Sequence, residues 1–170
     1  MKTKKLTTAA MLTALALILS YIERFIPLEM LLPLPGVKLG LANTVTLFAL
    51  FMLDAPVTLC ILIVRCLMGA LFSGSITGLA FSLSGGLLSM GVMLLSIRSP
   101  HLSIFGVSVL GAAAHSCGQI LAAIWLMGSV QVAAYLPYLI VVSVFCGIAT
   151  AGLTGSVIRI LRKTSAFVRR

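Results

Sequence analysis

The chain is a series of long apolar runs separated by short segments that contain polar residues, proline or glycine. Within these runs, apolar and polar positions do not alternate, as they would in a membrane β-barrel. Helices are the other structures that satisfy their own backbone hydrogen bonds in lipid. We therefore predict six helices, over residues 6–26, 39–53, 57–72, 78–97, 102–127 and 136–161.

Composition places these helices in a membrane. The chain is 61% hydrophobic and 9% charged, with a mean hydropathy of +1.22. A soluble domain of this size has too little interior to bury so much apolar surface. We expect an all-α, polytopic membrane protein with six transmembrane helices, forming a single integral membrane domain over residues 1–170.

The basic residues are concentrated at the two ends of the chain, whose formal net charge is +9. Eight of the 12 lysines and arginines lie there: Lys2, Lys4, Lys5, Arg159, Arg162, Lys163, Arg169 and Arg170. Because lysine and arginine accumulate at the cytoplasmic ends of membrane helices, both termini are predicted to be cytoplasmic. The pattern argues against a nucleic-acid partner; the alternative for the ends is a contact with anionic lipid or RNA.

Arg65 lies within an otherwise almost wholly apolar stretch, Pro56 to Phe72. At ~1.5 Å per residue it is roughly 13 Å from Pro56, about halfway through a ~30 Å hydrocarbon layer. An arginine at that depth costs ~2.5–3.5 kcal/mol on insertion scales. It therefore needs a polar partner or a water-filled cavity, as part of either a binding site or a structural contact.

A second polar group lies on the fifth predicted helix. Gly111, His115 and Gln119 are four residues apart and share one helical face. Their spacing predicts a polar stripe directed into the bundle at mid-depth. The alternative is that His115 only bonds a neighbouring helix.

The start of the second predicted helix is the third candidate region. Lys38 and Asn43 flank it, and the backbone N–H groups of a helix N-terminus favour an anion. The preceding loop, Pro27 to Lys38, contains prolines that block a regular helix and is expected on the outer side.

The acidic residues near Lys38 and Asn43 are not assigned to the inferred pocket. Glu23, Arg24 and Glu29 are predicted to form exposed ion pairs at the outer surface. With no certain acid near the buried cations, a ligand with carboxylate, phosphate or other acceptor oxygens is favoured.

No catalytic constellation is apparent. The chain has no Walker motif, no paired aspartate-rich motif for magnesium diphosphate chemistry, and no nucleophile–base pair. Its four cysteines lack metal-ligand spacing. We expect no enzyme activity, no metal and no cofactor.

Small residues recur every four positions in several predicted helices, which lets helices approach closely. They are Ser143, Gly147, Ala151 and Gly155 in the sixth, Gly78, Ser82 and Gly86 in the fourth, and Ala10 and Ala14 in the first. Each patch predicts packing against another helix of this chain or, alternatively, of a partner.

Four ordered segments resemble the Gx transporter family, which is also labelled heptaprenyl diphosphate synthase component I. They are residues 35–47 (PGVKLGLANTVTL), Arg65 to Gly74, Phe81 to Met90 and Gly111 to Gln119. Ser116 departs from the asparagine expected after the motif histidine.

That family resembles the substrate-binding S components of energy-coupling factor (ECF) transporters. The resemblance implies a six-helix bundle in the bacterial cytoplasmic membrane that binds a vitamin-like ligand beneath the loop joining its first two helices. It also implies docking through Ala10 and Ala14 onto a transmembrane coupling subunit that carries two ATPases. Some relatives are associated with flavin- and quinone-linked extracellular electron transfer.

Three hypotheses follow. The leading one is a non-enzymatic transport component that binds a small, anionic or acceptor-rich ligand at Lys38, Asn43, Arg65, His115 and Gln119. The second is an accessory membrane subunit that presents lipidic substrate to a soluble synthase of isoprenoid or quinone biosynthesis. The third is a structural membrane subunit in which the same residues only pack.

Overall fold

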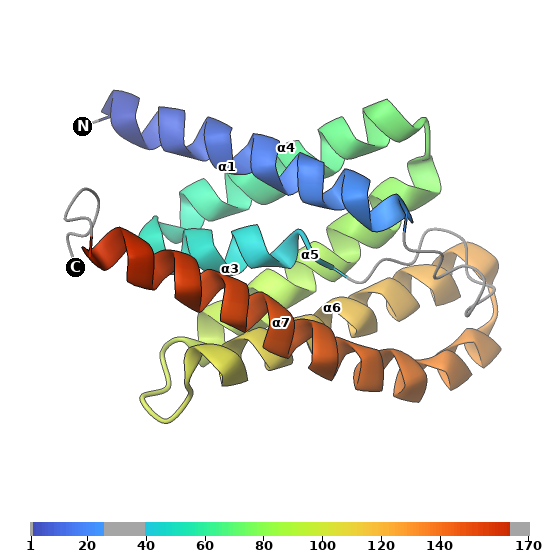
Figure 1. Ribbon diagram of the computed structural model, residues 1–170. Coiled ribbons are helices and arrows are strands. Elements are labelled where there is room, and N and C mark those ends of the chain that lie inside the picture. The colour runs from blue at the N-terminus through green and yellow to red at the C-terminus, as the bar shows by residue number, and fades with distance from the viewer. Residues whose placement is uncertain (1, 26–39, 164–170) are drawn as a thin grey trace.

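A computed structural model describes residues 2–25 and 40–163 of the chain. The elements within these residues are helices (Figure 1). They are α1 (Lys2–Ile22), η1 (Glu23–Phe25), α3 (Asn43–Met52), α4 (Ala55–Ser73), α5 (Ile76–Ser96), α6 (Ile104–Met127), η2 (Val130–Tyr135) and α7 (Leu136–Lys163), where η marks a 3-10 helix. Five of them are long and apolar enough to cross a membrane, and α3 is a shorter apolar helix. The predicted all-α membrane bundle is confirmed.

Capping serines determine where α5 and α6 begin. The apolar pattern placed the start of α5 too late and the start of α6 too early. α5 begins at Ile76, because the Ser75 hydroxyl accepts a hydrogen bond of 3.0 Å from the Gly78 N–H. Likewise, the Ser103 hydroxyl accepts one of 3.3 Å from the Gly106 N–H at the start of α6. A serine at this position satisfies a backbone donor that has no partner within the helix.

The short helix α3 occupies the centre of the bundle. It lies in the middle of the view in Figure 1 and contacts α1, α4, α5, α6 and α7. It begins at Asn43 rather than at the predicted residue 39, because Gly40 has a left-handed φ of +82° and residues 41–42 form a turn. At ~1.5 Å per residue it is about 15 Å long, half of a ~30 Å hydrocarbon layer.

The helices α5, α6 and α7 are held together by close backbone approaches. A Cβ added at Gly118 of α6 would lie 2.5 Å from the Ser84 carbonyl oxygen of α5. One added at Gly147 of α7 would lie 2.7 Å from the Val109 Cα of α6. The predicted packing role of Gly147 is therefore confirmed.

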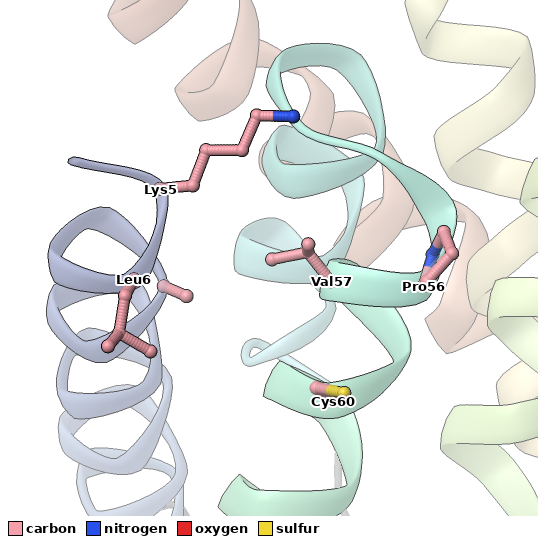
Figure 2. Close-up of a pocket in the computed structure, with 6 residues that line it drawn as sticks. Lys5, Leu6, Pro56, Val57 and Cys60 are labelled. Atoms are coloured by element: carbon pink, nitrogen blue, oxygen red, sulfur yellow. The ribbon is translucent and has the colours of Figure 1, made fainter. Parts of the chain in front are cut away.

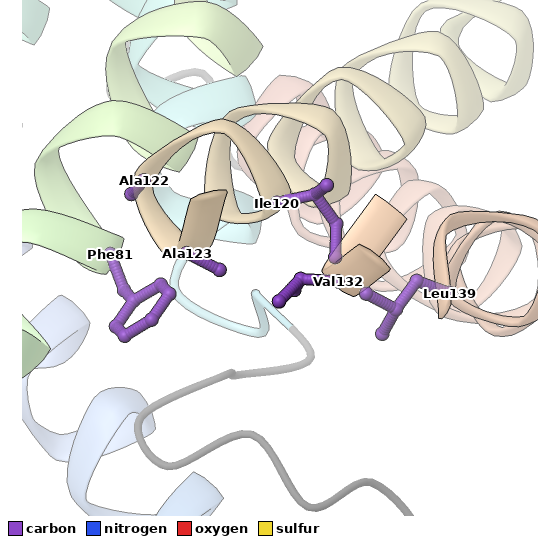
Figure 3. Packing of buried hydrophobic residues seen from close by; sticks show 6 residues of the cluster. All are labelled: Phe81, Ile120, Ala122, Ala123, Val132 and Leu139. Atoms are coloured by element: carbon purple, nitrogen blue, oxygen red, sulfur yellow. The ribbon is translucent and has the colours of Figure 1, made fainter. Parts of the chain in front are cut away.

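Apolar side chains of the same three helices pack together with η2. Figure 3 shows this cluster, in which every member is buried: Phe81, Ile120, Ala122, Ala123, Val132 and Leu139. On the outside of the bundle, large apolar side chains are exposed, for example Leu71 at 72%, Trp125 at 79% and Phe145 at 70%. Large apolar side chains on the outside of the bundle are what contact with lipid requires.

Candidate functional site

Arg65 is buried in the middle of α4, between α1, α3 and α5. Its side chain is 6% exposed, and its Nη2 donates a hydrogen bond of 3.4 Å to Asn43 Oδ1. Asn43 is the first residue of α3 and is itself 3% exposed. The structure therefore brings together two predicted site residues, and it keeps the guanidinium away from the lipid-facing surface.

Glu23 joins this group from the end of α1. It is 4% exposed, and its Oε1 accepts a hydrogen bond from the Gly40 N–H. The prediction that Glu23 lies in an exposed surface ion pair is wrong, because the turn after α1 directs it inward, toward Gly40.

His115 of α6 completes the group. A Cβ added at Gly40 would lie 3.0 Å from Asn43 Nδ2 and 3.1 Å from His115 Cδ2. On the other side, a Cβ added at Gly85 of α5 would lie 2.8 Å from His115 Cε1 and Nδ1. The imidazole thus lies between two glycines, and a side chain at either position would occupy the space of the ring.

Gln119 lies one turn beyond His115 on the same face of α6. It is fully buried, so the predicted inward direction of the stripe is confirmed. Both its amide nitrogen and its amide oxygen lack a hydrogen-bond partner within residues 2–25 and 40–163.

Further polar atoms of the group have hydrogen-bonding capacity to spare. Arg65 Nε and Asn43 Nδ2 also have no hydrogen-bond partner in the part of the chain that the structure describes. Buried polar atoms are otherwise nearly always paired. We call Glu23, Asn43, Arg65, His115 and Gln119 the polar cluster.

A small hollow adjoins Arg65 on the side of α1 and α5. Its volume is about 20 Å³, enough for one water molecule. It is lined by Ser20, Arg65, Cys66, Gly69, Ala70, Ser73, Gly78 and Ser82. The void expected beside the buried cation is present at the size of a water molecule, well below the ~300 Å³ of ordinary ligand pockets.

Two residues singled out in the sequence lie elsewhere. Lys38, with the rest of the Pro27–Lys38 loop, lies outside the described residues. Ser116, the departure from the family pattern, hydrogen bonds Ser143 of α7 at 2.6 Å. Ser116 therefore contributes to the packing of α6 against α7.

The first helix offers a separate surface. Ala10 and Ala14 are both exposed. Near them, a surface groove of about 370 Å³ separates α1 from α4 (Figure 2) and is lined by Lys5, Leu6, Ala9, Pro56, Val57 and Cys60. Above the groove, Lys5 Nζ pairs with Asp54 Oδ2 at 2.6 Å, both side chains being about half exposed.

The described residues contain no set of side chains that could bind a metal ion. No three histidine, cysteine, aspartate or glutamate side chains lie together there as a metal site would need. The polar cluster offers hydrogen-bond donors, the Gln119 amide oxygen as an acceptor and one carboxylate, which suit recognition of a polar molecule.

Comparison with known proteins identifies a family. No curated protein and no solved structure matches the chain. The family described as heptaprenyl diphosphate synthase component I matches residues 12–157. That region contains the whole polar cluster and most of the six α-helices. The chain therefore belongs to the heptaprenyl diphosphate synthase component I family.

Proposed function

We propose that this protein is the membrane-embedded substrate-binding component of a transporter, resembling ECF S components, and that it is not itself an enzyme. It binds a small vitamin- or cofactor-like ligand with carboxylate, phosphate or other acceptor oxygens. The binding residues are Asn43, Arg65, His115 and Gln119, together with Lys38. ATPase subunits in trans supply the energy.

One observation carries this proposal: a buried arginine surrounded by polar groups whose hydrogen-bonding capacity is not used. A cation at the centre of an apolar bundle is costly unless it serves a pathway or a ligand. Arg65 Nε, Asn43 Nδ2 and Gln119 Nε2 supply donors, which favours a ligand rich in acceptors.

Binding requires the bundle to open, because the hollow beside Arg65 has room for only one water molecule. The helix best able to move is α1, since only 11% of its most apolar stretch is buried in the bundle. Ser20 of α1 lines the hollow, so a shift of α1 away from α4 and α5 widens it.

The proposed orientation places both termini in the cytoplasm of a bacterium, with the protein in its cytoplasmic membrane. The eight basic residues at the ends support this orientation. The ends of α1 and the start of α3, where Glu23 and Asn43 lie, then face the outer half of the membrane, from which the ligand enters.

The test of ligand binding is mass spectrometry of small molecules that co-purify with the protein. We expect Arg65→Ala to lose the ligand while remaining folded. The matched control is Arg98→Ala, at the exposed turn after α5, which should retain it. An Arg65→Ala protein that keeps its full ligand content would overturn the site.

Docking onto a coupling subunit is proposed through Ala10 and Ala14. Their exposure leaves a flat strip of α1 available to a partner helix. Replacing both with leucine should abolish co-purification of a coupling subunit and ATPases, whereas Ala149→Leu on the exposed face of α7 should not. Equal recovery of partners by both variants would contradict the docking surface.

The family description favours a second candidate, an accessory membrane subunit for isoprenoid or quinone biosynthesis or for flavin- and quinone-linked electron transfer. The same pull-down separates the candidates. Recovery of a prenyl synthase without an ATPase would place this second function first.

A further inference from the structure

The buried acid in the polar cluster is the feature that the proposed function leaves unused. The chain has three acidic residues. Asp54 pairs with Lys5 at the surface. Glu23, by contrast, is 4% exposed and lies within the candidate site.

A continuous series of contacts links Glu23 to the arginine. Its Oε1 accepts from the Gly40 N–H. Gly40 lies against Asn43 Nδ2, at 3.0 Å from a Cβ position on the glycine. Asn43 Oδ1 in turn accepts from Arg65 Nη2 at 3.4 Å. The carboxylate and the guanidinium therefore belong to the same buried group, and Gly40 and Asn43 lie between them in this series of contacts.

This arrangement changes the charge that a ligand meets. A lone buried guanidinium would attract a phosphate or carboxylate strongly, because few other charges compete at low dielectric. With Glu23 nearby, an entering dianion gains attraction to Arg65 but meets repulsion from a buried carboxylate. A neutral carbonyl oxygen can accept hydrogen bonds from Arg65 Nε, Asn43 Nδ2 or Gln119 Nε2 without that repulsion.

We infer that Glu23 is an internal counter-ion that determines specificity, so that the site selects an uncharged, carbonyl-rich ligand and excludes phosphate dianions. This inference rests on the proposed function and narrows its ligand class. Glu23 acts through the charge of the site and through the position of Gly40.

The test measures the binding of inorganic phosphate to ligand-free protein in phosphatidylcholine nanodiscs, from the rise in thermal unfolding midpoint at constant ionic strength. Wild type should show no phosphate-dependent rise. Glu23→Gln should bind phosphate at least about tenfold more tightly, since a like-charge repulsion is removed. Glu23→Gln with Arg65→Gln should lose this binding again.

The matched control is Asp54→Asn, which removes one negative charge from an exposed pair. It should leave the protein as insensitive to phosphate as wild type. Glu23→Asp, which keeps the charge, should also remain insensitive. Phosphate binding by wild type equal to that of Glu23→Gln would overturn the inference, as would phosphate binding that persists in the double variant.

Folding of the single variant is itself informative, because a buried charge that has lost its partner is strongly destabilising. If Glu23→Gln does not accumulate, recovery of folded protein when Arg65→Gln is added supports the counter-ion role of Glu23, and absence of both variants overturns it. The co-purified ligand tests the proposed function separately. A bound ligand together with phosphate-binding wild type defeats only the inference, whereas phosphate exclusion without any ligand defeats only the proposed function.

Discussion

The most apolar stretches of helices α6 and α1 have nearly the same mean hydropathy, 1.5 and 1.6, yet 67% of that stretch is buried in α6 against 11% in α1. The two helices differ in where their small side chains lie. α6 carries Gly111 and Gly118 where neighbouring helices approach closely, whereas the small residues Ala10 and Ala14 of α1 are exposed. In a membrane, close packing of a helix therefore depends on small residues at the positions where helices meet, and mean hydropathy alone does not predict it.

The two regions therefore have different tasks. The α5–α6–α7 unit is a close-packed scaffold that fixes His115 and Gln119. α1 is an edge helix that contributes Ser20 and supports Glu23 while remaining able to move. Substitutions should have effects that decline from the scaffold to the edge.

The largest effect is expected at the closest backbone approach in the scaffold. Gly118→Ala puts a methyl group 2.5 Å from the Ser84 carbonyl oxygen, and overpacking of this kind should lower the free energy of unfolding by about 2–3 kcal/mol. Gly152→Ala is the control, because nothing lies within 4 Å of its Cβ position. Unfolding of both variants in mixed micelles measures the difference, and equal stabilities would show that the approach is not close.

An intermediate effect is expected at Gly40, between scaffold and edge. Gly40→Ala combines a left-handed φ of +82° with contacts to Asn43 and His115, so we expect a loss of about 2 kcal/mol, of which about 1 kcal/mol is backbone strain. Gly74→Ala has a φ of +61° but open space around it, and should show the strain alone. The same micelle unfolding compares them. If the Gly74 variant were as unstable as the Gly40 variant, the contacts of Gly40 with Asn43 and His115 would contribute nothing to stability.

A smaller effect is expected from the hydroxyl pair between α6 and α7. In a double-mutant cycle of Ser116→Ala and Ser143→Ala, the 2.6 Å hydrogen bond should give a coupling of about 0.6–1.7 kcal/mol. The exposed Ser156→Ala should be neutral. Additive losses at Ser116 and Ser143 would mean that the bond contributes nothing to packing.

The smallest effect is expected at the edge. Lys5 and Asp54 form an ion pair whose side chains are 52% and 46% exposed, so Lys5→Gln should change stability by less than about 0.5 kcal/mol and only at low salt. Unfolding at low and high ionic strength checks this. A loss above about 1 kcal/mol at high salt would make α1 part of the scaffold.

Much of the fold could be predicted from the sequence, because continuous apolar runs determine how many helices a membrane protein has. The starts of α5 and α6 followed capping by Ser75 and Ser103, which a search for apolar runs alone does not weigh. The late start of α3 depends on the backbone conformation at Gly40, which tertiary contacts with Glu23 and His115 stabilise.

The candidate site was predicted in part. Asn43, Arg65 and His115 stood out because charged, amide and imidazole side chains are rare in this chain, and the structure brings them together. Glu23 was missed because it lies beside Arg24 near the end of the first predicted helix, which suggested a surface ion pair. Its burial arises instead from a contact with Gly40, 17 residues away. The scarcity of acids was the available signal: in a chain with three acidic residues, a buried cation makes each of them a candidate counter-ion.

The half-length of α3 also restricts how this protein can vary. Its first residue is level with Arg65, so inserting even one turn there would carry Asn43 about 5 Å past the guanidinium. Insertions are therefore tolerated only at connections such as residues 98–103, where length is independent of register. A central helix that is short and fixed in length acts as a spacer that keeps the site at one depth.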